Sequence, residues 1–192
     1  MTSPLVQLRT SRMQSGEDAL VTRLLGKGSR KGSTLPGRAG DVIQHPPVWA
    51  SFAGILAMTG PGGRRAALRG AVGYAAATLL HLPLKGVTGR SRPRGAGLFH
   101  LGPVTSSFPS GHAGSDLAFV LAAAQEAPLL ALPLTAATMV VHWSLVRSRS
   151  HYPSDVFFGG VLGIAVVVAM ARVWPPVRGR SGSTSVSLSP NH

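Results

Sequence analysis

His151 and Asp155 are the residues of this chain whose types and spacing best suit nucleophilic chemistry. They are separated by Tyr-Pro-Ser, where the proline suits the first turn of a helix and Asp155 falls in that same turn. Residues at i and i+4 can meet on one face, so Asp155 can accept the Nδ1 proton of His151 and leave Nε2 free to attack. Taken alone, however, such a pair is more often a capping interaction at a helix start.

A second polar cluster reads Ser106-Ser-Phe-Pro-Ser110-Gly111-His112 and stands just before an apolar segment that begins near residue 113. Ser110 is a favourable N-cap, and the backbone N–H groups of Gly111 and His112 would point out of the helix start, where the dipole favours an anion. Gly111 also lacks a side chain that would crowd a bound phosphate. No Gly-x-Ser-x-Gly pattern surrounds the serine, which disfavours an acyl-transfer triad.

The third cluster consists of four cations within ten residues, Lys85, Arg90, Arg92 and Arg94, directly after an apolar segment. Such a group indicates an anionic partner, although a basic patch that touches lipid head groups would have the same composition. Two histidines and one aspartate could instead ligate a metal. Cations this close would repel a metal ion, so we expect none.

Five apolar segments must position these clusters, at residues 48–58, 68–84, 113–124, 129–146 and 156–173. The last is long enough to cross a hydrocarbon core of about 30 Å. Between Arg94 and Arg147 the only charged side chains are Asp116 and Glu126, too few for the polar faces of a soluble bundle. The sequence therefore predicts an all-α, polytopic transmembrane helical bundle with about five visible spans.

The basic residues give this bundle an orientation. One group precedes the second segment and another follows the last, and both belong on the cytoplasmic side by the positive-inside rule. Residues 85–112 and 147–154 then lie together on the outer face. The two groups are Arg64, Arg65 and Arg69, and Arg172, Arg178 and Arg180.

Composition narrows the choice of function further. The chain has 192 residues, enough for one domain, a formal charge of +13 and no cysteine, which excludes disulfides, thiolate metal sites and a cysteine nucleophile. Much of the basic charge lies in membrane-flanking clusters and an N-terminal arm rather than on one solvated face. We therefore expect no nucleic-acid partner.

The order and spacing of the three clusters resemble the type 2 phosphatidic acid phosphatase (PAP2) superfamily. The matching elements are Lys85-x6-Arg92-Pro, Pro-Ser110-Gly111-His112, and Ser144 with His151-x3-Asp155. The resemblance covers about residues 48–174. It implies a helical bundle, no cofactor, and metal-independent hydrolysis of a phosphomonoester or diphosphate at the membrane surface.

The resemblance also assigns roles to individual residues. It implies that His151 attacks phosphorus to form a phosphohistidine, that Asp155 orients it, and that His112 protonates the leaving oxygen and later activates water. The phosphoryl oxygens would be held by Lys85, Arg92, Ser110 and the backbone of Gly111. These roles agree with general chemistry, because fixed cations and the amides at a helix start stabilise the charge on a transferring phosphoryl group.

One departure from the family pattern concerns the third cluster. The family has Ser-Arg-x5-His-x3-Asp, whereas this chain has Leu145 after Ser144. Arg147 and Arg149 are possible substitute phosphate ligands, although Arg147 lies about half a helical turn round from position 145. A catalytically impaired protein that binds anionic lipid head groups is the alternative that Leu145 favours.

We accordingly expect an integral phosphatase of a bacterial cell membrane, with its active site on the outer face. Its substrate would be a lipid phosphate, such as phosphatidate or phosphatidylglycerol phosphate, or a polyprenyl (di)phosphate. A haloperoxidase would share the anion site, but those enzymes are larger and soluble. The expected organisation is a basic, largely irregular arm at 1–47, in which 18–25 could form one or two helical turns, the PAP2-like transmembrane domain at 48–174, and a disordered tail at 175–192.

Overall fold

The computed structural model describes residues 14–23, 42, 45–88, 90–93, 106–147 and 149–177. The described residues are helical without any strand, which confirms the all-α class. Arg94, Arg178, Arg180 and most of the predicted arm and tail lie outside the described residues. Five helices follow the arm in chain order: α3 (Pro46–Met58), α4 (Pro61–Thr88), α5 (Gly111–Ala124), α6 (Pro128–Arg147) and α7 (Pro153–Val173).

Proline begins four of these helices, because its fixed φ suits the first turn and its missing N–H would have no helical partner there. The exception is α5, which begins after Ser110. The Ser110 hydroxyl accepts a hydrogen bond from the backbone N–H of Ala113 at 3.3 Å, so the predicted N-cap is confirmed. Helix α4 starts seven residues earlier than its apolar segment predicts, and its first turns therefore include Arg64, Arg65 and Arg69.

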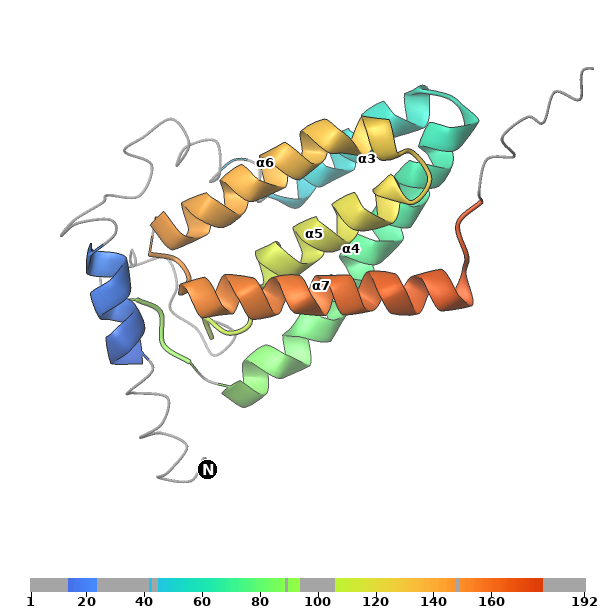
Figure 1. Ribbon diagram of the computed structural model, residues 1–192. Helices are drawn as coiled ribbons and strands as arrows, with labels where there is room; N and C mark the ends of the chain where they lie inside the picture. Colours follow the sequence, from blue (N-terminus) through green and yellow to red (C-terminus); the bar gives the residue numbers. More distant parts are fainter. Residues whose placement is uncertain are drawn as a thin grey trace, which may run out of the picture.

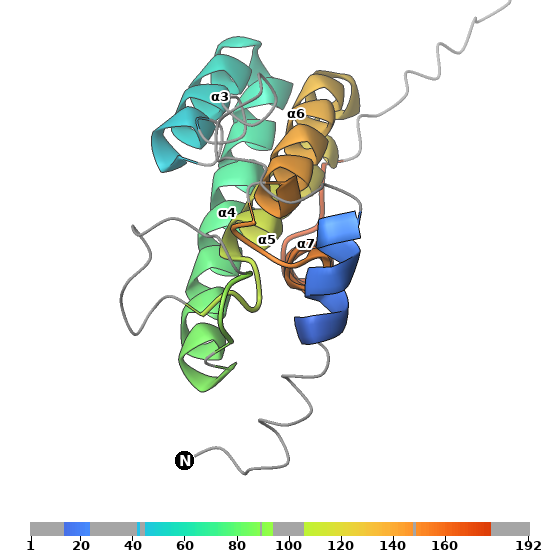
Figure 2. The same cartoon turned by 90° about the vertical axis from the view of Figure 1, so that its left-hand side faces the viewer.

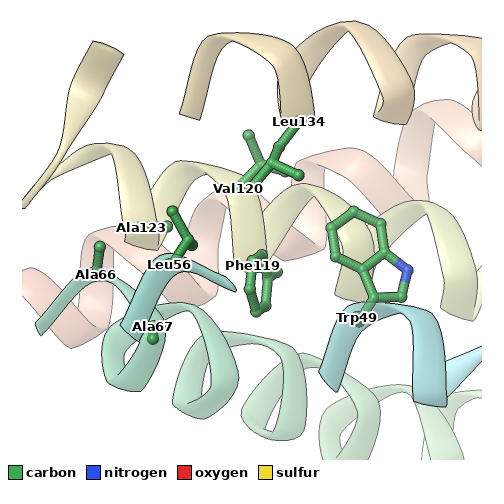
Figure 3. Packing of buried hydrophobic residues seen from close by; sticks show 8 residues of the cluster. All are labelled: Trp49, Leu56, Ala66, Ala67, Phe119, Val120, Ala123 and Leu134. Carbon is green, nitrogen blue, oxygen red and sulfur yellow. The ribbon is translucent and has the colours of Figure 1, made fainter. Parts of the chain in front are cut away.

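The centre of the bundle is α5, which contacts α4, α6 and α7 (Figure 1). Trp49 of α3 is buried against Phe119 of α5, with ring centroids 5.1 Å apart. Much of the surrounding core is alanine, which lets the helices approach closely. Figure 3 shows the cluster, which comprises Trp49, Leu56, Ala66, Ala67, Phe119, Val120, Ala123 and Leu134.

Glycines set the distance between α5 and α7. A Cβ atom added at Gly163 would lie 2.3 Å from the carbonyl oxygen of Gly114, and one at Gly159 would lie 2.3 Å from that of Ser110. Neither position can carry a side chain without moving a backbone. The start of α7 is consequently held against the start of α5, and the N–H of Ser110 donates to the carbonyl oxygen of Asp155 at 2.9 Å.

The outer surface of the bundle is apolar. Among the described helices, α6 and α7 are long and apolar enough to cross a membrane, whereas α5 has only 14 residues and α4 carries four basic residues. Large hydrophobic side chains project outward where a soluble protein would place polar ones, which suits a lipid environment. They include Leu79, Leu82, Leu129, Leu132, Phe157, Val161, Ile164 and Val168.

Arg69 ties together the end of the bundle at which α4 starts and α7 finishes. Its guanidinium is fully buried and donates to the carbonyl oxygen of Trp174 at 2.7 Å and to the side chain of Gln125 at 2.6 Å. Glu126 accepts from Arg65 at 3.1 Å in the same cluster. Those basic residues expected on the cytoplasmic side that the structure describes thus lie at the end of the bundle where the α5–α6 turn is found.

The N-terminal arm contains a helix at residues 14–23, and the last two residues of the arm, 46 and 47, belong to α3. The helix at 14–23 is longer than the one or two turns predicted near 18–25, of which 24 and 25 lie outside the described residues. Figures 1 and 2 show it at the opposite end of the bundle from the Arg69 cluster, beside the start of α7. Val21 is 1% exposed, so this helix is packed rather than extended into solvent.

Candidate active site

The three polar clusters meet at one end of the bundle. Residues 90–93 follow α4, residues 106–110 precede α5, and residues 149–152 connect α6 to α7. Figure 2 views the molecule from this end. Segment 106–110 is joined to segment 90–93 because the N–H of Ser107 donates to the carbonyl oxygen of Arg90 at 2.8 Å and its hydroxyl donates to that of Ser91 at 2.9 Å.

His151 is held with Nε2 as its unprotonated nitrogen. Nδ1 lies 2.7 Å from the carbonyl oxygen of Ser107, which can only accept, so Nδ1 carries the proton. Nε2 lies 3.3 Å from a guanidinium nitrogen of Arg92, which can only donate. The two contacts require the same tautomer, in which Nε2 carries no proton and its lone pair faces Arg92.

The partner of Nδ1 differs from the one that the i, i+4 spacing predicted. A carboxylate oxygen of Asp155 lies 3.7 Å from Nδ1, beyond hydrogen-bond distance but close enough for an ion pair with a positively charged ring. The difference arises because the Asp155 carboxylate is occupied elsewhere. One oxygen accepts from Arg90 at 2.6 Å, and the other accepts from the backbone N–H of Tyr152 at 2.9 Å.

Arg90 was one of four cations in the sequence and had no assigned role. Its guanidinium also donates to the hydroxyl of Ser154 at 2.7 Å and lies over the ring of Tyr152, 4.5 Å from the centroid. Spacing alone could not separate Arg90 from Arg92. The structure does so, because Arg90 binds the carboxylate of Asp155 while Arg92 faces the imidazole.

Burial lowers the pKa of His151, whose side chain is 3% exposed. The nearby Asp155 raises this pKa, whereas the cations Arg92 and Lys85 lower it, and burial is the largest of these effects. The imidazole is therefore neutral over a wider pH range than a free histidine. A neutral ring is the form that a nucleophile requires.

The residues expected to hold phosphate lie around the start of α5. Arg92 donates to the carbonyl oxygen of Ser150 at 2.5 Å, which fixes its guanidinium beside His151. The Lys85 ammonium lies 3.5 Å from the point where a Cβ on Gly111 would be, so Lys85 stands over the first turn of the helix. The Ser110 hydroxyl accepts as a helix cap, and its own proton is left for another acceptor.

His112 lines a cavity of about 200 Å³ next to this cationic group. It is close enough to His151, Lys85 and Arg92 for electrostatic interaction. The cavity has hydroxyl groups and apolar walls together. Its lining comprises Pro46, Tyr74, Thr78, His81, Leu82, Lys85, Gly111, His112 and Ser115.

Position 145 takes part in the site through its backbone. The carbonyl oxygen of Leu145 accepts from the N–H groups of Ser150 and His151, both at 3.1 Å, while its side chain is 3% exposed. Arg149 has a left-handed φ of 55° and turns the chain back at the end of α6. Arg147 and Arg149 are both half-buried beside this turn, and their use as substitute phosphate ligands stays a prediction.

A buried histidine beside fixed cations, on a helical bundle with an apolar exterior, suits a membrane protein that binds a phosphate group. The model of the PAP2 superfamily matches residues 66–178, which include all three clusters. This chain therefore belongs to the PAP2 superfamily, as its motifs predicted, and membership supports a phosphatase activity.

Comparison with solved structures supports the same fold. The chain is similar to a crystal structure described as the first transmembrane PAP2 type phosphatidylglycerolphosphate phosphatase from Bacillus subtilis. The TM-score is 0.62 at 17% identity, and the match covers 88% of this chain and 92% of that one. At this identity the likeness establishes the fold alone. A comparison with curated proteins gives no significant match.

Proposed function

We propose that this chain is an integral membrane phosphatase that hydrolyses a lipid-linked phosphomonoester or diphosphate through a phosphohistidine on His151. The observation that carries the proposal is the pair of contacts made by this ring, Nδ1 with the Ser107 carbonyl oxygen and Nε2 with Arg92. Together they present an unprotonated nitrogen beside a guanidinium. A phosphate group bound there would have its phosphorus next to this nitrogen and one of its oxygens next to the guanidinium.

In the first step, the Nε2 lone pair forms a bond to phosphorus while the bond from phosphorus to the leaving oxygen breaks. His112 gives a proton to that oxygen, and Lys85 and Arg92 stabilise charge on the other phosphoryl oxygens. The phosphorylated ring is positively charged because Nδ1 keeps its proton. Asp155, at 3.7 Å, supplies the opposite charge.

In the second step, His112 takes a proton from water as the water oxygen attacks phosphorus. The bond between phosphorus and Nε2 then breaks, inorganic phosphate leaves and the neutral ring of His151 is restored. No metal ion enters either step, because fixed cations and the amides at the start of α5 supply the positive charge.

The cavity beside His112 supports an amphiphilic substrate. Since His112 serves the leaving group, the alcohol part of the substrate would occupy this space, where Thr78 and Ser115 provide hydroxyls and Leu82 provides apolar contact. A tail could remain in the bilayer against the apolar exterior. Phosphatidate, phosphatidylglycerol phosphate and polyprenyl (di)phosphates all have this form, and the description of the Bacillus subtilis neighbour supports the second.

The distribution of charge supports an active site on the outer face. Arg64, Arg65 and Arg172 lie at the end of the bundle away from His151, and basic flanks favour the cytoplasmic side. The substrate phosphate would then be hydrolysed on the far side of a bacterial cell membrane.

The decisive experiment uses the full chain, purified in detergent and supplied with each of these lipids. We expect phosphate release that persists in EDTA, is inhibited by vanadate and is abolished by His151→Ala together with the acid-labile phosphoenzyme. Normal turnover by His151→Ala would refute the nucleophile. No hydrolysis by the native chain, with anionic lipid still bound, would favour the second candidate, an impaired lipid-binding protein suggested by Leu145.

A further inference from the structure

The N-terminal helix at residues 14–23 contributes a carboxylate to the active-site end of the bundle. One oxygen of Glu17 accepts from the guanidinium of Arg90, and the other accepts from the backbone N–H of Ser154 at 3.2 Å. The Glu17 side chain is 17% exposed and that of Arg90 is 8% exposed. Glu17 lies outside residues 66–178, which the family model matches.

Arg90 is therefore shared between two carboxylates. It binds Asp155 through one terminal nitrogen and Glu17 through the other. Two negative charges and one positive charge give this trio a net charge of about −1 at neutral pH. Without Glu17, the positive charge of Arg90 would neutralise Asp155.

The charge of the trio matters because of what surrounds His151. Among the described residues, the charged or titratable groups around its ring are Asp155 of α7, Arg92 of segment 90–93, Lys85 of α4 and His112 of α5. Only Asp155 among them carries negative charge. Among these groups, Asp155 supplies the opposite charge for a ring that becomes cationic on phosphorylation, and Arg90 weakens that charge. Asp18 of the arm helix acts on the neighbouring Tyr152 rather than on the ring.

We propose that Glu17 is a positioning residue for the reaction at His151, which holds Arg90 and keeps the trio with Asp155 anionic so that the ring can accept positive charge. This inference rests on the proposed function. Glu17 acts through Arg90 and touches neither the ring nor the substrate. The arm helix is then part of the catalytic unit rather than a membrane-surface segment.

The test compares Glu17→Gln, which keeps the shape and removes the charge, with Glu17→Asp, which keeps the charge. For Glu17→Gln we expect kcat to fall on the order of tenfold, with KM for the lipid phosphate unchanged or lower, because repulsion of the anion decreases. The acidic limb of kcat/KM should move to lower pH by about half a unit, since a lost negative charge disfavours protonated His151. Glu17→Asp should return the limb to its native position.

Glu126→Gln is the matched control. Glu126 is also paired with arginine and accepts from a backbone N–H, that of Val177 at 3.0 Å, but it lies at the opposite end of the bundle. The Glu126→Gln variant should lower the melting temperature as much as Glu17→Gln does, and the acidic limb of its kcat/KM profile should not move. The proposal would be overturned if Glu17→Gln kept the native kcat and the native acidic limb of kcat/KM. It would also be overturned if Glu17→Gln and Glu17→Asp shifted that limb equally.

A second measurement does not require turnover. The pH dependence of His151 modification by diethyl pyrocarbonate, read by mass spectrometry of its peptide, reports the protonation of the ring directly. Glu17→Gln should shift this profile to lower pH and Glu126→Gln should not. If the native chain releases no phosphate, the proposed function fails while this profile still decides the role of Glu17; an unshifted profile contradicts the positioning role.

Discussion

Arg92 lies 3.3 Å from Nε2 of His151 and is fixed there by the carbonyl oxygen of Ser150, which accepts from the same guanidinium nitrogen at 2.5 Å. A phosphoryl group whose phosphorus met Nε2 would have an oxygen within reach of this guanidinium. The geometry of this pair is the basis for the first prediction.

Arg92→Ala should lower kcat/KM on the order of 10²-fold or more, because it removes a donor to a charged oxygen in a buried site. Arg92→Lys should recover only part of the loss, since an ammonium lacks the two-pronged geometry. Arg172→Ala, an exposed arginine at the far end of α7, is the control and should leave phosphate release unchanged. Equal effects of Arg92→Ala and Arg172→Ala would exclude a role for Arg92 in the site.

The pH dependence of kcat/KM should have its acidic limb below the ordinary histidine value of about 6.5. The reaction requires neutral His151, and burial lowers the pKa of this group, so the neutral form persists as the pH falls. The lowered pKa of His151 also sets the direction in which folding stability changes with pH. Stability from the neutral buried ring is present above about pH 6.5 and is lost as the pH falls toward the lowered pKa. An acidic limb above 6.5 that belongs to His151 would contradict this assignment.

Leu145→Arg should raise kcat/KM several-fold. Position 145 lies on the buried side of α6 at the active-site end, and its carbonyl oxygen already binds the backbone of His151. An arginine there would add a bidentate phosphate donor. Leu145→Met is the control for altered packing, and turnover on one lipid phosphate is the measurement.

Arg147→Ala and Arg149→Ala in the native chain test the competing arrangement. If one of these arginines already serves as the phosphate ligand, its removal should cost on the order of 10²-fold in rate, and Leu145→Arg should give no gain. If Leu145→Arg raises the rate as we expect, adding Arg147→Ala to that variant should change the rate little.

Gly163→Ala should destabilise the bundle by about 2 kcal/mol, because the added methyl group would overlap the backbone of α5. A Cβ at Gly163 would lie 2.3 Å from the carbonyl oxygen of Gly114, whereas one at Gly160, on the same helix, would lie 3.4 Å from a methyl group of Leu117. Gly160→Ala is therefore the matched control and should leave the melting temperature equal or higher. Similar melting temperatures for the two variants would show that the helices do not meet at Gly163.

The orientation of the bundle can be measured by labelling. The chain has no cysteine, so Ser91→Cys, beside the active site, and Val177→Cys, at the other end, would each carry the only thiol. An impermeant thiol reagent applied to intact cells should label position 91 and spare position 177. The reverse pattern would place the active site in the cytoplasm.

The apolar segments, the basic flanks and the motif spacing predicted the helical bundle, the Ser110 cap and the meeting of the three clusters. They could not predict that His151 binds a backbone carbonyl, because every residue has one and the identity of Ser107 carries no signal. The same patterns could not predict the role of Glu17 either. Its partner Arg90 lies 73 positions away, and no local pattern encodes a contact across that distance. The start of α4 was missed because its first turns are basic rather than apolar.

The hydrogen bond from the N–H of Ser110 to the carbonyl oxygen of Asp155 has a consequence for biosynthesis. Asp155 belongs to α7, the last of the described helices in chain order, and Arg69 near the start of α4 reaches the carbonyl oxygen of Trp174 just after that helix ends. A chain that stops before α7 retains His151 but lacks Asp155, and it leaves the N–H of Ser110 and a nitrogen of Arg69 without these acceptors. We therefore expect the site to be assembled only once α7 has inserted into the bilayer, and chains truncated before α7 to release no phosphate.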